Sequence, residues 1–379
     1  MTLLSFIIPT RDRPEELQRT LAALGALETP RDSAFAWCEC EAIIIDNAGA
    51  TPVQVPDVLA NGLPVQVMRL RANLGAAARN EAATRAAGKW LVMLDDDSAP
   101  DDGALLALLP HVPEQVVGLC ADIRIPQRGR EAGGLPEVPI GCGVALRRDA
   151  FLAVGGYDSS YQFYAEEYDL AAKLIRLHAD EPGPIFAHEP QFRVTHRKVA
   201  TNRSMNTILH RLVRNNAWTI QRYTPDAYLD AALRHMLDRY RAIARKEDAM
   251  AGYGAGRQDV EESLAHQPRA PLPQPLYDRF TGLAATRAHI KREHAIRPFT
   301  SAHIIHPGKN EWAVRQALGE LGVDLVDANE TADVHVIGTL SPGPLLDAFD
   351  QASASSRVLK PWEPHPARRA HADRATLHT

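Results

Sequence analysis

The stretch that decides the fold is Gly88-Lys89-Trp90-Leu91-Val92-Met93-Leu94-Asp95-Asp96-Asp97-Ser98-Ala99-Pro100. Its apolar run is too short for an ordinary helix and lies between Gly and Pro, so it predicts a buried strand that ends in three consecutive carboxylates. Clustered like charges repel one another, and a hard cation such as Mg²⁺ or Mn²⁺ among them would relieve that repulsion. An isolated acidic triplet is explained equally well by a solvated turn or a helix cap, so the rest of the chain has to decide.

Length and composition limit the possible classes of protein. The chain has 379 residues, 45% of them hydrophobic, which is enough for one large domain or two smaller ones. Its net charge of -5 argues against a nucleic-acid-binding protein. The sequence contains no stretch apolar enough to span a bilayer and no basic leader, so we expect a cytoplasmic protein. Cys38, Cys40, Cys120 and Cys142 lack metal-binding spacing and are expected to be reduced structural thiols.

Strands and helices alternate through the first hundred residues. Strands are expected at 3–8, 41–45, 65–70 and before Asp95, and helices at 15–27 and 76–87. This alternation predicts an α/β fold with a mostly parallel sheet flanked by helices, in which the polar loops at the carboxyl ends of the strands share one edge. Thr10, Asp46, Asn73 and the acidic triplet all lie on that edge. Because open α/β sheets bind ligands there, a binding site explains the triplet better than a turn does.

Four short segments follow one another along this edge. They are Phe6-Ile7-Ile8-Pro9-Thr10-Arg11-Asp12-Arg13-Pro14, Ile44-Ile45-Asp46-Asn47, Asn73-Leu74-Gly75 with Arg79-Asn80, and Leu94-Asp95-Asp96-Asp97. In order and spacing they resemble the family 2 glycosyltransferases of the GT-A (Rossmann-like) fold, over residues 1–204. The resemblance implies an inverting, metal-dependent enzyme that transfers a sugar from a nucleotide-diphosphate sugar to a hydroxyl group.

The resemblance also implies roles for individual residues. The positions that would line the nucleotide-sugar are Pro9, Thr10, Arg11, Asp46, Asn73, Gly75 and Arg79. Asp46 would bind the base, which favours a uridine or thymidine nucleotide. Asp95 and Asp97 would form the DxD pair that holds Mn²⁺ or Mg²⁺. Asp96, between them, would face the ribose or the sugar.

A second acidic motif is Tyr164-Ala165-Glu166-Glu167-Tyr168-Asp169-Leu170. It resembles the family's Glu-Asp-x-Asp-Leu motif, in which the second acid is the general base. That position is Glu167, a Glu in place of Asp, and Glu166 stays a second candidate. Without the resemblance, acids in the first turn of a helix would be the simplest explanation.

His196 ends an expected strand at 192–196. It is similar to the histidine that completes the metal site in many GT-A enzymes, so the resemblance makes it the third metal ligand. Arg197, Lys198 and Arg203 would then stabilise the departing diphosphate, unless they form a solvated basic face.

The remainder of the chain is expected to form three parts. They are a helical extension at 205–298 with a proline-rich loop near 268–275, a small α/β unit at 299–350, and a disordered tail at 351–379. The small unit carries no motif and is expected to serve docking or homo-oligomerisation. A basic helical segment at 225–251 permits peripheral contact with an anionic membrane, although its interleaved acids argue against that contact.

Three functions are compatible with these patterns. The first is an inverting glycosyltransferase that uses a UDP- or dTDP-sugar and a hydroxyl acceptor such as a growing glycan or a glycosylated metabolite. The others are an inactive nucleotide-sugar-binding homologue and another sugar-nucleotide enzyme, such as a nucleotidyltransferase. Pro9-Thr10-Arg11-Asp12 replaces the glycine-rich turn expected of nucleotidyltransferases, dinucleotide oxidoreductases and P-loop proteins. An inactive homologue would be expected to lose acids, yet Asp95, Asp97 and Glu167 are present.

Overall fold

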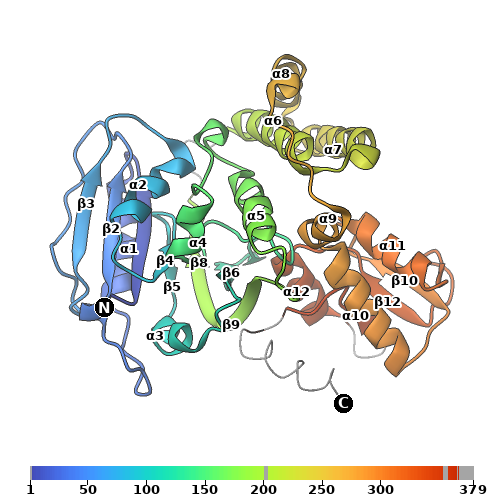
Figure 1. Ribbon diagram of the computed structural model, residues 1–379, viewed down its shortest axis with the longest axis horizontal. Coiled ribbons are helices and arrows are strands. Elements are labelled where there is room, and N and C mark those ends of the chain that lie inside the picture. The colour runs from blue at the N-terminus through green and yellow to red at the C-terminus, as the bar shows by residue number, and fades with distance from the viewer. Residues whose placement is uncertain (1, 200–203, 353–356, 365, 367–379) are drawn as a thin grey trace.

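The protein contains two β-sheets in a computed structural model that describes residues 2–199, 204–352, 357–364 and 366 (Figure 1). The large sheet runs in the order β3 (Val65–Arg69), β2 (Glu41–Asp46), β1 (Leu4–Thr10), β4 (Trp90–Met93), β8 (Val144–Arg147), β6 (Gly118–Ile125), β9 (Phe186–His196) and β5 (Ser98–Pro100), and β7 (Gly129–Arg130) pairs with β6. The small sheet runs in the order β11 (Asp324–Leu325), β10 (Ser301–Ile305), β12 (Val334–Ile337) and β13 (Val358–Leu359).

The α/β fold class expected from the sequence is confirmed. Strands β3, β2, β1 and β4 are parallel, as the βαβ alternation predicts. Beyond β4 the large sheet is mixed, because β8 runs antiparallel to both of its neighbours and β5 runs antiparallel to β9. The pairs from β3 to β4 are therefore all parallel, whereas the second half of the sheet combines these antiparallel pairs with the parallel pair β6–β9.

Helices cover both faces of the large sheet. They are α1 (Pro14–Gly25), α2 (Ala78–Arg85), α3 (Ala104–Leu108), α4 (Arg148–Ala153) and α5 (Glu166–Leu177). Alternate strand residues point to opposite faces, so Ile7 and Ile43 pack in one apolar cluster and Phe6 and Ile44 in the other. The first cluster contains buried residues of α2, α4 and α5, and the second contains those of α1 and α3. Both faces are thus dry, which explains the near-continuous apolar runs of β1, β2 and β4.

The short strand β5 lies where the sequence suggested only a turn. It pairs with the end of β9, with Ser98 opposite His196, and the backbone N–H of Arg197 donates to the carbonyl oxygen of Asp97 at 2.9 Å. This pairing brings His196 to the acidic triplet.

The helical extension consists of α6 (Met205–Tyr223), α7 (Asp226–Lys246), α8 (Met250–Ser263), α9 (Gln274–Thr281) and α10 (Leu283–Ile296). Helices α6, α7 and α8 share an apolar cluster of their own, centred on Leu209, Val213 and Met236. In the part of the chain that the structure describes, no helix is both long and apolar enough to cross a membrane.

The small α/β unit contains the small sheet, whose pairings are all parallel, with helices α11 (Glu311–Glu320) and α12 (Pro342–Gln351). Figure 1 shows it beyond α5 and α9, on the far side from β3. One apolar cluster continues from the large sheet through α5 and α9 into the small sheet. The unit extends past its expected end at 350, because β13 and the buried Trp362 belong to it. Residues 353–356, 365 and 367–379 of the expected disordered tail lie outside the described residues.

Gly75 joins the edge of the large sheet to the loop before α5. Its φ is +61°, and an added Cβ would collide with the carbonyl oxygen of Gln162, to which the N–H of Ala76 donates at 2.6 Å. Gly155 also has a positive φ, +74°, but an added Cβ there would meet open space.

We predict that Gly75→Ala destabilises the protein more than Gly155→Ala does. Both changes place a Cβ in the left-handed region, at about 1 to 2 kcal/mol. Only Gly75→Ala adds overpacking, at about a further 1 to 3 kcal/mol. Urea denaturation followed by circular dichroism measures the difference. Equal losses of unfolding free energy in the two variants would show that Gly75 is not in close contact with the loop at Gln162.

Candidate active site

The carboxyl edge of the large sheet opens onto a cleft of about 1240 Å³. Its walls come from the large-sheet domain, the helical extension and the small α/β unit. Pockets for a single small ligand span about 300 to 1,000 Å³, so the cleft has room for two ligands side by side. The candidate residues that line it are Pro9, Thr10, Arg11, Asn73, Arg79, Asp95, Asp96, Glu166, Glu167 and His196. Asp46, Gly75 and Asp97 are not part of its lining.

Arg13 neutralises two carboxylates of the acidic triplet. Its guanidinium donates to Asp96 at 2.6 Å and to Asp97 at 2.7 Å, and the hydroxyl of Thr10 donates to Asp96 at 2.7 Å. Burial raises the pKa of Asp96 to about 6, against the opposite effect of Arg13. The sequence analysis did not single out Arg13. It lies next to Pro14 just before α1, and only the tertiary structure shows that it faces the end of β4.

Arg79 holds the remaining acid of the triplet. Its guanidinium donates to Asp95 at 2.6 Å and to the carbonyl oxygen of Leu94 at 3.0 Å, from a side chain that is almost fully buried. Arg79 therefore fixes the direction of the Asp95 carboxylate, which is itself partly exposed to the cleft.

His196 lies between two carboxylates. Its Nδ1 is 2.8 Å from Glu131, and its Nε2 is 3.3 Å from Oδ1 of Asp97. Burial lowers the pKa of His196, but hydrogen bonding to Asp97, Cys142 and Glu131 outweighs burial and raises that pKa to about 12. Glu131, whose other oxygen accepts from Lys198 at 2.7 Å, was not predicted, because its loop carries no recognisable motif.

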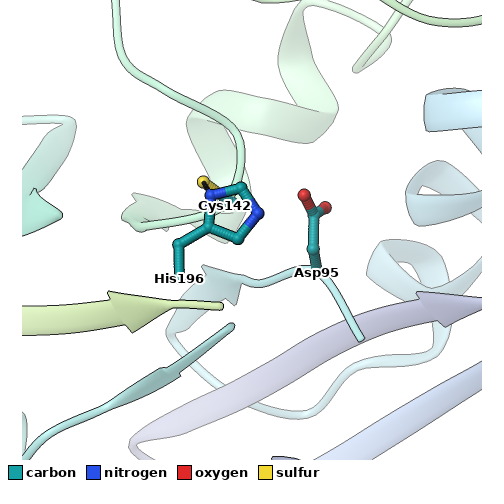
Figure 2. Close-up of side chains that lie close together, drawn as sticks. All are labelled: Asp95, Cys142 and His196. Carbon is teal, nitrogen blue, oxygen red and sulfur yellow. Dashed lines mark hydrogen bonds between the residues drawn. The ribbon is translucent and has the colours of Figure 1, made fainter. Parts of the chain in front are cut away.

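The residues around His196 fit a divalent cation. Ligand atoms of Asp95, Cys142 and His196 all lie within 4.8 Å of one another (Figure 2). Within the described residues, Oδ1 of Asp97 and Nε2 of His196 are buried without a well-aligned hydrogen-bond partner. Buried orphan ligand atoms of this kind are what a metal ion would satisfy.

The compact group of possible ligand atoms contains Cys142 beside the predicted ligands Asp95 and His196. Cys142 was expected to be a structural thiol, but its sulfur lies 3.6 Å from Nδ1 of His196 and belongs to the compact group. Asp97 is not a member of that group, and its Oδ2 accepts hydrogen bonds from Arg13 and from the N–H of Val199. Cys142 follows Gly141 in a loop, so neither periodicity nor cysteine spacing could indicate its position. The metal-binding role of Asp97 stays a prediction.

Glu166 and Glu167 begin α5 on another wall of the cleft. Burial raises the pKa of both carboxyls, and for Glu166 the nearby charge of Glu167 adds to the effect. Glu167 accepts from the N–H of Gly141 at 3.3 Å, whereas Oε2 of Glu166 is buried without a partner among the described residues. Glu167 is therefore the more easily ionised of the two.

Asp169 faces away from the cleft. It accepts from Arg222 at 2.9 Å and from the hydroxyl of Tyr223 at 2.7 Å, so it anchors α5 to α6.

Asp46 and Asn47 organise the loops at the carboxyl end of β2. Asp46 is fully buried, and its carboxylate accepts from the N–H groups of Gly49 at 2.8 Å and Val53 at 3.3 Å. Asn47 lines the cleft and donates to the carbonyl oxygen of Gly75 at 3.2 Å. The base-binding role of Asp46 stays a prediction, and Asn47 is the residue of this pair that the cleft exposes.

Of the two predicted basic residues after β9 that the structure describes, Lys198 reaches the cleft and Arg197 does not. Lys198 lines it, whereas Arg197 donates to Thr20 at 2.6 Å and to Glu16 at 3.1 Å behind the acidic triplet. Arg203 lies outside the described residues.

Comparison with known protein families gives a match to glycosyl transferase family 2 over residues 5–165. The sequence of residues 5–165, less than half of the chain, is therefore similar to this family. The resemblance inferred from the sequence motifs is confirmed, and the match includes the acidic triplet but ends just before Glu166.

The proteins to which this chain is similar are distant in sequence. The chain is 26% identical over 205 residues to an uncharacterized glycosyltransferase of Haemophilus influenzae, in a match that covers 46% of this chain and 62%, less than two thirds, of the relative. The crystal structure of GalNAc-T7 with UDP, GalNAc and Mn²⁺ is 17% identical, with a TM-score of 0.47 over 72% of this chain and 59% of that one. The crystal structure of S. aureus TarS 1-349 is 15% identical, with a TM-score of 0.45 over 84% of this chain and 91% of that one.

We predict that Glu131→Gln weakens Mn²⁺ binding by about 10- to 100-fold, because carboxylates that orient a metal-binding histidine contribute on that scale. Isothermal titration calorimetry on the chelator-treated protein measures the affinity. Glu189→Gln is the matched control, since Glu189 is also buried but accepts from the N–H of Gln191. Unchanged Mn²⁺ affinity in Glu131→Gln would mean that His196 does not depend on Glu131 for its orientation.

Proposed function

We propose that the protein is an inverting glycosyltransferase that moves a sugar from a nucleotide-diphosphate sugar to a hydroxyl acceptor. The observation that carries this proposal is that one cleft is lined by Asp95, Asp96, His196 and Glu167, beside the segment that matches glycosyl transferase family 2. The cleft is large enough to hold a donor and an acceptor together. Holding two reactants in one geometry makes the transfer effectively unimolecular.

Asp95 and His196 would hold the metal ion, with Asp97 and Cys142 beside them. When bound, the ion supplies positive charge that stabilises the diphosphate leaving group. Mn²⁺ suits this group better than Mg²⁺, because Mg²⁺ prefers oxygen ligands and the group includes an imidazole and a thiol. Arg79 and Arg13 fix the carboxylates in place before any donor binds.

Pro9, Thr10, Arg11 and Asn73 would line the nucleotide. Asp46 would recognise the imide N–H of uracil or thymine, which a carboxylate can accept and a guanine edge does not offer in the same pattern. The Asp46 carboxylate accepts from the N–H groups of Gly49 and Val53, so binding of the base requires the loop at 46–53 to give up one of these hydrogen bonds.

Uridine and thymidine diphosphates are therefore predicted to stabilise the protein more than guanosine diphosphate does. Thermal-shift measurements with UDP, dTDP and GDP, each in the presence of Mn²⁺, test the order. Stabilisation by GDP alone would remove the assignment of the base.

Glu167 would act as the general base. It would take the proton of the acceptor hydroxyl while the new bond forms opposite the departing diphosphate, so no covalent intermediate is needed. Burial raises the pKa of Glu167 toward neutral pH, and a general base is most effective when its pKa lies near the working pH. Glu166, whose pKa is raised well above its usual value, would remain protonated beside it.

We predict that Glu167→Gln lowers transfer by about 100-fold or more and leaves UDP affinity unchanged. Glu166→Gln, which replaces a protonated carboxyl by a neutral amide, should lower transfer less. Transfer rates at saturating donor, together with UDP titrations, measure both effects. Near-normal transfer by Glu167→Gln with collapse in Glu166→Gln would assign the base to Glu166.

The pH dependence of transfer provides a separate prediction. The base is active when ionised, and burial raises its pKa, so activity should fall as pH drops through a value above the usual glutamate range. A kcat/KM profile between pH 4 and 8 measures this acidic limb. An acidic limb at an ordinary glutamate pKa would contradict a buried base.

A further inference from the structure

The small α/β unit presents a ligand-binding edge to the same cleft as the large sheet. Its strand order is β11-β10-β12-β13, so the chain leaves β10 toward one side and β12 lies on the other. Open α/β sheets bind ligands at such a switch point, outside the carboxyl ends of the two strands. The loops that follow β10 and β12, which contain Lys309 and Ser341, line the cleft. The unit therefore forms part of the cleft, whereas the sequence suggested a docking or oligomerisation element.

Direct contacts fix this unit against the glycosyltransferase domain. Arg130 forms ion pairs with Asp347 at 2.8 Å and Asp350 at 2.7 Å on α12. The hydroxyl of Ser341 donates to the carbonyl oxygen of Gly133 at 2.6 Å. Within the unit, the N–H of Leu340 donates to the carbonyl oxygen of Lys309 at 2.9 Å, which ties the two cleft-lining loops together.

Among the cations that line the cleft, Lys309, Arg239 and Arg211 have no carboxylate partner within the described residues. Lys309 lies over the ring of Tyr168, with its Nζ 4.6 Å from the ring centroid. Arg239 of α7 lies over Tyr240, and Arg211 of α6 lies over Phe163. On the proposed donor side of the cleft, by contrast, Arg13, Arg79 and Lys198 each form an ion pair with a carboxylate.

Lys309 and Arg239 lie close enough to affect each other. Burial and then the charge of Arg239 lower the pKa of Lys309 to about 7, while Glu167 opposes the shift. Glu167, the proposed general base, is therefore the acid whose charge acts on Lys309. Keeping cations together in a partly buried cleft is unfavourable unless an anion joins them.

We propose that Lys309, Arg239 and Arg211 bind a phosphate ester carried by the acceptor, at the end of the cleft formed by the small α/β unit. The proposal rests on the proposed glycosyltransferase function and names the class of its acceptor. A phosphate dianion matches several cations better than a carboxylate does, and arginine binds it through two parallel hydrogen bonds. Binding there places the hydroxyl groups of the acceptor beside Glu167.

The test is calorimetric titration of the full chain saturated with UDP and Mn²⁺. The probes form a matched series: glycerol 2-phosphate, the carboxylate glycerate, and neutral glycerol. Glycerol 2-phosphate should bind at least tenfold more tightly than the other two. Lys309→Met and Arg239→Leu should each weaken its binding by tenfold or more, and Lys309→Arg should restore most of it.

Lys291→Met and Arg241→Leu are the controls, because they make the same charge changes at exposed positions away from the cleft. All variants should bind UDP as the unmodified protein does, which also shows that they fold. Equal binding of glycerate, absence of glycerol 2-phosphate binding with UDP bound, or unchanged binding in both cleft variants would overturn the proposal alone. Failure of the unmodified protein to bind UDP would overturn the proposed function and this inference with it.

Discussion

Mutual repulsion among three consecutive carboxylates at the end of β4 is the constraint on which the active site depends. A strand whose faces are both dry cannot end in this much negative charge without compensation. The structure supplies it from three directions: Arg79 on Asp95, Arg13 on Asp96 and Asp97, and His196 on Asp97. These contacts join α1, α2 and β9 to β4. The elements that assemble the site are therefore the same elements that make the acidic triplet tolerable.

The pairing of β5 with β9 has a comparable effect on the opposite side of the triplet. It fixes His196 beside Asp97, and Glu131 then orients the imidazole from a neighbouring loop. A cation bound by Asp95 and His196, as we propose, would lie beside these carboxylates. Its binding would compete with protonation of His196.

The cleft as a whole combines two α/β sheets. Both place the carboxyl ends of parallel strands toward it. The large sheet contributes acids and paired arginines, and the small unit contributes Lys309, which has no carboxylate partner among the described residues and to which α6 and α7 add Arg211 and Arg239. Glu167 lies between these two regions of charge. In the function we propose, this asymmetry separates the metal-dependent donor from an anionic acceptor, with the base between them.

The sequence by itself determined the first half of the large sheet, the carboxyl edge that carries Thr10, Asn73 and the acidic triplet, and the similarity of residues 5–165 to glycosyl transferase family 2. Those features depend on apolar periodicity and on short motifs, which are written within a few neighbouring residues. Only the tertiary structure decided that the rest of the sheet is mixed, that Arg13, Glu131 and Cys142 join the site, and that Lys309 reaches the cleft. The reason is physical. Each of those outcomes is a contact between segments far apart in the chain, and strand pairing and domain docking depend on the surfaces that meet, which no local pattern encodes.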